Sequence, residues 1–426
     1  TVVVNSTDGW DSVTLADTQA STFTINNGSD WSAEDIASVV IDLKDATGTT
    51  DAITINLNNT QTGDAGEQDD FAITTGITAN DIETINLNTS FVSDESTAEV
   101  VTLAALTTDD ATTLNISGTA DLTITAALDT DIETITSTST GDTTLTLSGG
   151  DVAYTGGSGV DTLNFGTSLT AADTVDGGDG TDVVNATFNS GTVTPANFSN
   201  VETFNATFSG GALNASGLTS ISTINIVDTT TGAVLSGLAN TTTTITQQGS
   251  DIAAAKALNL LYASGADATV TYNNADATEN VLNSATSTTN IKNLTVAAGD
   301  GEDDDRTVSL GSLNGGTSLD ALTLTTGDDI GDTLTTGNIT AANLETLTIT
   351  ADEADITVGT FASAGELKTL TIGNLDSASD GNITIGAIGA GSAADEMTSF
   401  TVATSGSSTE GTTVLDMDNI DAEGAT

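Results

Sequence analysis

Two turns rich in glycine and aspartate are the stretches whose residue order implies a specific chemistry. Residues 156–164 read GGSGVDTLN, and residues 177–185 read GGDGTDVVN. Both match the nonapeptide G-G-x-G-x-D-x-U-x, where U is apolar, at every fixed position. The glycines permit backbone conformations with φ > 0 that turn carbonyl oxygens inward, and the aspartate adds a carboxylate. Since Ca²⁺ takes about six to eight oxygen ligands, the two nonapeptides predict calcium binding.

Carboxylates and turn oxygens of both nonapeptides are the predicted calcium ligands: Gly156, Ser158, Asp161, Gly177, Asp179 and Asp182. Acidic glycine-rich turns also form without an ion, so plain β-turns are the alternative. The two matches begin 21 residues apart, and this repetition favours calcium.

Two later loops carry the same chemistry in degenerate form. Five carboxylates fall within residues 300–305, and a second acidic group occupies residues 327–332. Adjacent carboxylates repel one another and cost stability unless a cation lies between them. We therefore expect calcium there, with solvated acidic turns as the alternative; for the early loops at 8–13 and 63–71 solvated turns are favoured. The predicted ligands of the later loops are Asp300, Asp303, Asp304, Asp305, Asp328, Asp329 and Asp332.

The composition restricts the partners of the chain. Its 426 residues include 60 acidic and 5 basic side chains, a net charge of −55. Such a charge repels nucleic acid and anionic membranes and attracts cations. Cysteine and histidine are absent, which removes disulfides, thiolate chemistry, the usual zinc ligand and the commonest general base. No apolar run of about 18 residues occurs, so we expect no membrane insertion.

Short alternating segments recur along the sequence and predict an all-β chain. Residues 52–57, AITINL, and residues 143–147, TTLTL, alternate apolar and polar side chains between turn-forming residues. A motif of the type D-I-E-T-I repeats at roughly 20 to 28 residues. A recurrent strand at that spacing predicts a β-solenoid with short stacked strands. The second apolar position of the motif marks the expected stacks: Leu163, Val184, Phe204 and Ile224, then Leu294, Leu322, Leu347 and Leu370.

One segment departs from this pattern. Residues 251–263 are rich in alanine and leucine, follow an N-cap candidate and end near Gly265, so they predict one short helix. Covering a sheet edge is its expected role, and recruiting a partner subunit is the alternative. We expect four regions: a β-rich solenoid at 1–148, a calcium-binding β-roll or solenoid at 149–248, a helix-containing insertion or cap at 249–290, and a second solenoid at 291–426.

A catalytic set is hard to assemble from these residues. Solenoid polysaccharide lyases combine calcium with a basic residue as catalytic base, and Arg306 beside the acidic loop is the candidate that fits. The four lysines are scattered, and aromatic residues make up only 4% of the chain. We therefore do not expect an enzyme, and we expect Arg306 to pair with its acidic neighbours.

The chain resembles bacterial surface-layer proteins of the calcium-dependent RTX type, such as that of Caulobacter. The resemblance depends on the two nonapeptides, the acidic composition rich in Thr, Ala, Asn and Gly, the missing cysteine and the scarce lysine. The resemblance implies type I secretion, a β-solenoid lattice region, and calcium-dependent assembly on lipopolysaccharide. The nonapeptides cover under a tenth of the chain, and no anchoring domain or secretion signal is recognisable. The chain begins at Thr1 without methionine, and we expect it to be the ordered part of a longer precursor.

These features predict a secreted structural protein of the extracellular cell surface. We expect calcium as its cofactor and further copies of itself as its main partner, in a two-dimensional lattice or filament, with cell-surface polysaccharide as another partner. A surface layer is the first prediction. An RTX-type adhesin or surface filament stalk is the alternative, and a calcium-dependent polysaccharide lyase ranks below both.

Overall fold

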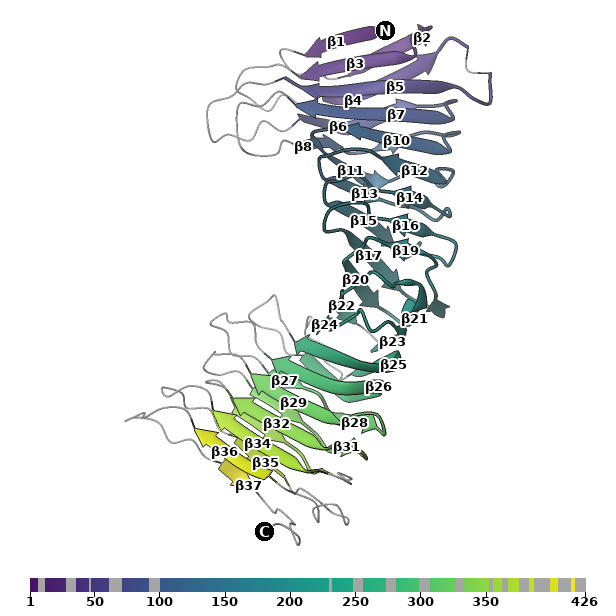
Figure 1. Ribbon diagram of the computed structural model, residues 1–426. Coiled ribbons are helices and arrows are strands. Elements are labelled where there is room, and N and C mark those ends of the chain that lie inside the picture. Colours follow the sequence, from purple (N-terminus) through teal and green to yellow (C-terminus); the bar gives the residue numbers. More distant parts are fainter. Residues whose placement is uncertain are drawn as a thin grey trace. The chain divides into compact units, whose positions relative to one another are not determined.

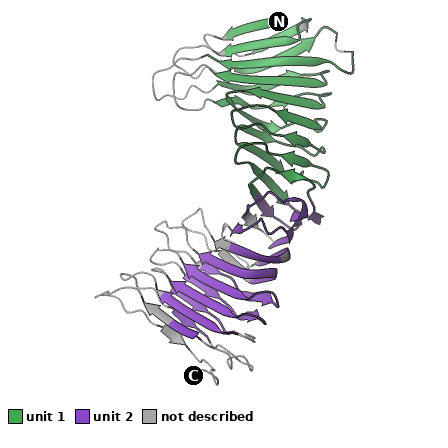
Figure 2. Ribbon diagram, viewed as in Figure 1, with its two compact units in different colours: residues 1–187, 195–204 green, residues 188–194, 205–426 purple. Residues whose placement is uncertain are grey.

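Parallel strands stack into two units along the chain (Figure 2). Unit 1 comprises residues 1–187 and 195–204, and unit 2 comprises residues 188–194 and 205–426. The computed structural model describes residues 1–6, 12–27, 36–45, 47–60, 71–91, 100–229, 232–247, 256–272, 281–298, 307–326, 333–351, 355–361, 367–374, 383–386, 399–404 and 415–417.

The coils of unit 1 stack with parallel strands along two sides (Figure 1). One side is a nine-stranded sheet: β1 (Val2–Ser6), β3 (Thr22–Asn27), β5 (Ala52–Asn59), β7 (Thr84–Phe91), β10 (Thr113–Gly118), β12 (Thr134–Ser137), β14 (Ala153–Thr155), β16 (Thr174–Asp176) and β19 (Phe198–Ser199). The other side holds β2 (Val13–Thr18), β4 (Ile36–Leu43), β6 (Phe71–Ala79), β8 (Val100–Leu103), β9 (Leu106–Thr107), β11 (Asp121–Ala127), β13 (Thr143–Thr146), β15 (Asp161–Gly166) and β17 (Val183–Phe188).

Unit 2 repeats the same construction (Figure 1). Its first strands are β18 (Thr192–Val193), β20 (Thr203–Phe208), β21 (Ala212–Asn214), β22 (Thr223–Thr229), β23 (Ala233–Leu238) and β24 (Thr244–Gln247), with the 3-10 turn η1 (Ala215–Gly217). Two long strands follow, β25 (Lys256–Tyr272) and β26 (Val281–Ala298). The later coils contain β27 (Thr307–Ser309), β28 (Ser312–Gly316), β29 (Ala321–Thr326), β30 (Thr333–Thr336), β31 (Ile339–Ala341), β32 (Thr346–Ala351), β33 (Asp355–Val358), β34 (Thr369–Asn374), β35 (Ile383–Ile385), β36 (Ser399–Thr404) and β37 (Leu415–Met417).

Apolar side chains alternate into the coil interior, which is why these short segments form strands. In β5, for example, Ile53, Ile55 and Leu57 are fully buried, and the residues between them are partly exposed. Ile55 pairs in register with Phe23 on one side and Leu87 on the other, so each apolar side chain stacks on those of the neighbouring coils. Each such burial contributes about 1.5–3 kcal/mol. The all-β solenoid prediction is confirmed.

The predicted repeat is also confirmed where registers are described. Leu163 pairs with Val184 in unit 1. In unit 2, the marker leucines form one continuous column, each pairing with the next in a parallel register: Leu294, Leu322, Leu347 and Leu370.

The predicted helix is wrong where it falls on described residues. Lys256 to Ala263 belong to β25, which pairs in parallel with β23 and β26, and residues 251–255 lie outside the described residues. Leu258, Leu260 and Tyr262 are buried at every second position. Alanine and leucine favour a helix locally, but stacking on the apolar columns of adjacent coils outweighs that preference.

Asparagine ladders run along the outer face of the nine-stranded sheet. Asn26 donates from its side-chain nitrogen to Asn5 Oδ1 at 2.7 Å, Asn58 donates to Asn26 at 2.8 Å, and Ser90 donates its hydroxyl to Asn58 at 2.7 Å. Each amide therefore satisfies the next one along the stack. Such ladders hold the register of neighbouring coils because a one-residue slip would break every one of these bonds.

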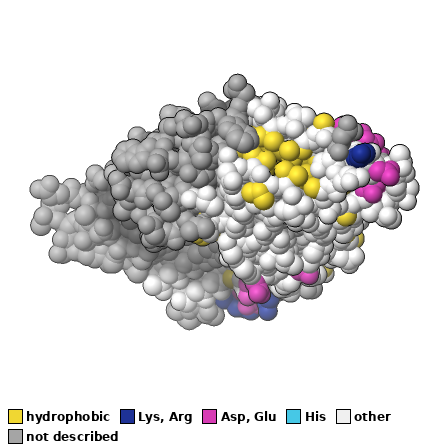
Figure 3. Space-filling model, turned by 90° about the horizontal axis from the view of Figure 1, so that it is seen from above, with side chains coloured by type: hydrophobic (Ala, Val, Ile, Leu, Met, Phe, Trp, Pro, Cys, Tyr) yellow, Lys and Arg dark blue, Asp and Glu magenta, His cyan; other side chains and the backbone are white. Residues whose placement is uncertain are grey.

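The end of unit 1 that carries β1 and β2 shows a group of apolar side chains, with acidic side chains near the rim (Figure 3). Val2 of β1 and Leu15 of β2 are partly exposed there, and Val3 is 55% exposed. Each solenoid coil packs against its neighbours on both sides, so the first coil of a stack leaves part of its apolar surface uncovered.

Candidate metal centre

The two nonapeptides lie in adjacent coils of unit 1, one above the other. Each turn connects a strand of the nine-stranded sheet to a strand of the opposite side, β14 to β15 in the first case and β16 to β17 in the second. The register of β15 with β17 places Asp161 beside Asp182, and the Asp161 N–H donates to Asp182 Oδ1 at 2.8 Å. The repeat therefore brings two carboxylates of the predicted site together.

The glycines of these turns are required by close contact between coils. A side chain at Gly156 would collide with the Gly177 carbonyl oxygen and with Asp161 Oδ2. A side chain at Gly177 would likewise collide with the Asn200 carbonyl oxygen and with Asp182 Oδ2. Each first glycine thus lies against a carbonyl oxygen of the next coil and a carboxylate oxygen of its own nonapeptide. These are the hard oxygen atoms that calcium prefers.

Gly178 has a second reason to be glycine. Its φ is +95°, a conformation that costs any residue with a side chain, and a Cβ there would also meet the Gly157 carbonyl oxygen. The two adjacent glycines of the motif are therefore required for close stacking of neighbouring coils, whether or not an ion binds.

Asp161 and Asp182 are both only 2% exposed, and each has one oxygen without a partner. Asp161 Oδ2 accepts the Gly157 N–H at 3.2 Å, and Asp182 Oδ1 accepts the Asp161 N–H. Asp161 Oδ1 and Asp182 Oδ2 have no hydrogen-bond partner. Leaving a buried polar atom unsatisfied costs about 1–3 kcal/mol, and more when the group is charged.

Two uncharged polar atoms beside Asp161 are also buried without a partner. They are the Tyr154 hydroxyl and Thr143 Oγ1. Both face the Asp161 carboxylate, but no pair of these atoms meets ordinary hydrogen-bond geometry. Thr143 and Asp161 are register partners on β13 and β15, whereas Tyr154 comes from β14 in the opposite sheet.

The electrostatics match this burial. Burial raises the pKa of Asp182 to about 7, and the negative charges of Asp161 and Glu202 add to the rise, whereas the hydrogen bond from the Asp161 N–H opposes it. Burial also raises the pKa of Asp161. The Tyr154 pKa is raised by burial first and then by the Asp161 charge, so this phenol stays neutral. A cation or a proton is needed to compensate the carboxylates.

Neighbouring acidic residues have a structural role that needs no ion. Glu202 Oε2 accepts the Asp182 N–H at 2.8 Å, and Asp142 Oδ1 accepts the Val160 N–H at 2.7 Å. Asp121 Oδ1 in turn accepts the Asp142 N–H at 2.7 Å. Carboxylates along this edge therefore cap backbone N–H groups of adjacent coils, and Asp161 and Asp182 combine this capping with an unsatisfied oxygen.

The remaining predicted ligands are less well placed. Ser158 and Asp179 are exposed at the turns. Asp179 contributes its backbone N–H to the Gly157 carbonyl at 3.0 Å. Residues 299–306 and 327–332 lie outside the described residues. They include the lyase-base candidate Arg306 and the other predicted ligands: Asp300, Asp303, Asp304, Asp305, Asp328, Asp329 and Asp332.

Within the described ranges, one group brings three carboxylates within mutual ligand distance. It consists of Asp81, Asp109 and Asp110, all exposed, with Asp109 Oδ1 accepting the Asp81 N–H at 2.7 Å. The pKa of Asp110 is raised, chiefly by desolvation and then by its acidic neighbours. Solvent satisfies exposed carboxylates readily, so this group needs a cation less than the buried pair does.

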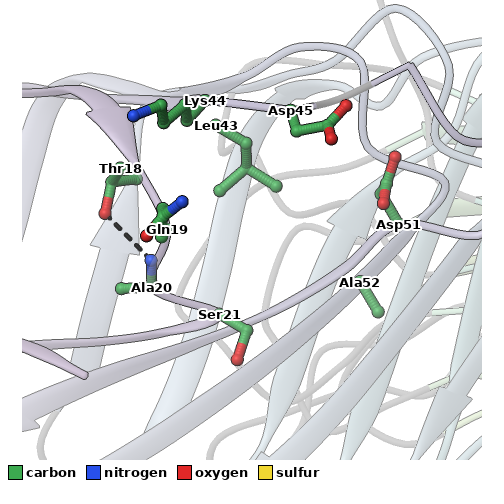
Figure 4. A pocket seen from close by; sticks show the side chains of 9 residues that line it. All are labelled: Thr18, Gln19, Ala20, Ser21, Leu43, Lys44, Asp45, Asp51 and Ala52. Atoms are coloured by element: carbon green, nitrogen blue, oxygen red, sulfur yellow. Dashed lines mark hydrogen bonds between the residues drawn. The ribbon is translucent and has the colours of Figure 1, made fainter.

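A polar cleft opens elsewhere in unit 1, between the turns that precede β3 and β5 (Figure 4). Gln19 and Lys44 lie on one side of it, and Asp45 and Asp51 lie on the other. The Thr18 hydroxyl accepts the Ala20 N–H at 3.1 Å within the lining. Its side chains are mostly exposed, and they are not arranged as a nucleophile and base.

Comparisons with known proteins do not place the chain in a family. No protein-family model matches it, and no curated protein or solved structure shows significant similarity to it. Across the described residues, no helix has the length and apolar character needed to cross a membrane.

Sequence reasoning identified Asp161 and Asp182 but overlooked Thr143, Tyr154 and Glu202. For Thr143 and Glu202, the spacing of the repeat indicated a position next to the two aspartates. Thr143 begins its strand where Asp161 begins the next, and Glu202 follows Asp182 by 20 residues. Tyr154 carried no such signal, because its reach across the interior depends on how the two sheets face each other.

Proposed function

We propose that the chain is a structural protein of an extracellular, calcium-stabilised array, and specifically of a bacterial surface layer. Two buried carboxylates in adjacent coils, each with an unpartnered oxygen, carry this proposal. The donor set of carboxylates and backbone carbonyls fits a hard divalent cation. Asp161, Asp182 and the carbonyls beside Gly156 and Gly177 would hold it, and the cation would neutralise their charge.

Cation binding at this site would increase the free energy of unfolding of unit 1. A cation that binds only the folded coils adds stability in proportion to the logarithm of its concentration over Kd. It also links consecutive coils, in addition to strand pairing, apolar stacking and the side-chain hydrogen bonds between them. Calcium would therefore act as a reversible cross-link between coils in a chain that has no cysteine for disulfides.

The array part of the proposal depends on charge and repetition. Copies with a net charge of −55 repel one another at low ionic strength, and divalent ions are the agents that can bridge their acidic surfaces. The uniform solenoid with no assembled catalytic set among its described residues suits a structural role. The resemblance to RTX surface-layer proteins supports secretion, an extracellular location, and self-association with cell-surface polysaccharide as a further partner.

Negative-stain electron microscopy of the purified chain, with calcium and after EGTA, tests the proposal alongside circular dichroism. We expect ordered sheets only with calcium, and a loss of them in the D161N/D182N variant. A chain that folds and binds calcium but stays monomeric would contradict the array and favour an adhesin or filament stalk. A fold and an assembly state that ignore EGTA would contradict calcium altogether.

A further inference from the structure

Four buried polar atoms without partners gather in three consecutive coils of unit 1. Thr143 belongs to the first coil, Tyr154 and Asp161 to the second, and Asp182 to the third. The two other such atoms in the described part of the chain belong to Thr108 and Thr288, elsewhere in the fold. The gathering of the four is therefore a feature of the nonapeptide region.

Tyr154 and Thr143 each follow an aliphatic side chain of the preceding coil in their stack. Tyr154 pairs in register with Ile135 on one side and Val175 on the other, and all three are buried. Thr143 pairs with Leu122 and with Asp161. Two columns from opposite sheets thus change from apolar to polar in consecutive coils, and both polar groups face one carboxylate.

We propose that Tyr154 and Thr143, which lie outside both nonapeptides, supply inner oxygen ligands of the cation site, so that the site extends from the turns into the solenoid interior. Asp161 Oδ1 lies at its inner end, and Asp182 in the next coil adds the second negative charge. The ligand is a hard divalent cation, because two carboxylates with two neutral hydroxyl oxygens match its charge and its preference for oxygen. This inference depends on the proposed function, since the cation is the same one.

A buried hydroxyl that serves as a ligand has a recognisable signature. Without the ion it is an unsatisfied polar atom, so replacing it by an apolar group of similar shape leaves the protein equally or more stable. With the ion the same replacement removes a ligand and weakens binding. A hydroxyl with only a structural role shows the same change with and without the ion.

The experiment uses the variants Y154F and T143V, with Y262F as the matched control. Tyr262 is also buried, but its hydroxyl donates to the Thr242 carbonyl at 2.8 Å, in unit 2. Calcium affinity is measured by isothermal titration of the EGTA-treated chain, and Tm is measured with EGTA and with calcium. Terbium luminescence excited through tyrosine provides a second measure of binding close to Tyr154.

We expect Y154F and T143V each to weaken calcium affinity by at least about tenfold, as changes beside a metal ligand commonly do. Their Tm in EGTA should equal or exceed that of the unmodified chain. Y154F should also lose most of the sensitised terbium emission, whereas Y262F should keep both the affinity and the emission.

Two other results would overturn the inference in different ways. If both variants bind calcium normally and lower Tm equally with and without it, the hydroxyls serve the fold alone, and the calcium-stabilised array stands without them. If the unmodified chain itself takes up no calcium, the proposed function fails together with this extension of it.

Discussion

The same backbone position carries a charged side chain in both units, but the sign of that charge differs. In unit 1, Glu202 donates its N–H to the Asp182 carbonyl at 3.2 Å, and both residues are acidic. In unit 2, Lys368 donates its N–H to the Glu345 carbonyl at 2.9 Å, and its ammonium contacts Glu345 Oε1 at 2.8 Å. Unit 2 therefore supplies its own cation at a position where unit 1 has another acid.

A second lysine of unit 2 also lies beside an acidic side chain of an adjacent coil. Lys292 lies one coil before Asp320, with 3.8 Å between the ammonium and Asp320 Oδ2. These side chains are 60% and 41% exposed, whereas Asp161 and Asp182 are 2% exposed. Water screens the charges of Lys292 and Asp320 in unit 2, whereas Asp161 and Asp182 in unit 1 expose almost no surface to it. Burial, more than the number of acids, creates the need for a bound cation.

Removing the buried charges should give the largest effect. We expect D161N/D182N to lose the stabilisation of unit 1 by calcium, which is about 4 kcal/mol at a free concentration of 1,000 times Kd. Stability in EGTA should not fall, because a buried uncompensated charge has been removed. Hydrogen exchange of peptides covering residues 143–186, with calcium and with EGTA, measures this directly. A variant that is still stabilised by calcium would place the ion elsewhere.

Asp173, in the same region, is a buried aspartate whose two carboxylate oxygens are both hydrogen-bonded. Asp173 has no exposed surface, and its two carboxylate oxygens accept the N–H groups of Val152 and Thr170, each at 2.7 Å. D173N should destabilise unit 1 by about 1–3 kcal/mol, because one N–H loses its acceptor. Urea unfolding should show the same loss in calcium and in EGTA. A loss confined to calcium would make Asp173 part of the ion site.

Unit 2 offers the converse test, with a smaller expected effect. K292M/K368M removes both ammonium groups from the column that contains Asp320 and Glu345. The loss in EGTA should stay below about 1 kcal/mol per pair, because the pairs are exposed. Calcium should restore most of it, which hydrogen exchange of peptides covering residues 319–350 would detect. A large loss that calcium does not reverse would mean that the lysines act by packing.

The smallest expected effect is a pH dependence. Burial raises the Asp173 pKa above its usual 3.8, against the opposing hydrogen bonds from Val152 and Thr170. Protonation of Asp173 therefore favours the folded state. Its contribution to the free energy of unfolding is complete below pH 3.8 and is lost as pH rises through the pKa of the folded state. In EGTA, the stability of the unmodified chain should fall more steeply than that of D173N as pH rises above 3.8. Parallel curves would contradict this.

Much of the fold could be predicted because each coil repeats one local pattern. The alternation of Thr346, Leu347, Thr348 and Ile349 specifies a strand with one apolar face, and its recurrence in β29 and β34 specifies the stack. Where helix propensity and alternation conflict, as at Leu258 and Leu260, the neighbouring coils decided the outcome. Their apolar columns lie far away in the sequence and are not visible to a local window.

Periodicity and composition were enough to predict the all-β stacked architecture, the pairing of the two nonapeptides and the negative charge. The folded chain was needed to show that Asp161 and Asp182 are buried with unpartnered oxygens, and that Tyr154 reaches the same place from the opposite sheet. Burial and convergence depend on how two sheets close around a shared core. No single coil contains that information.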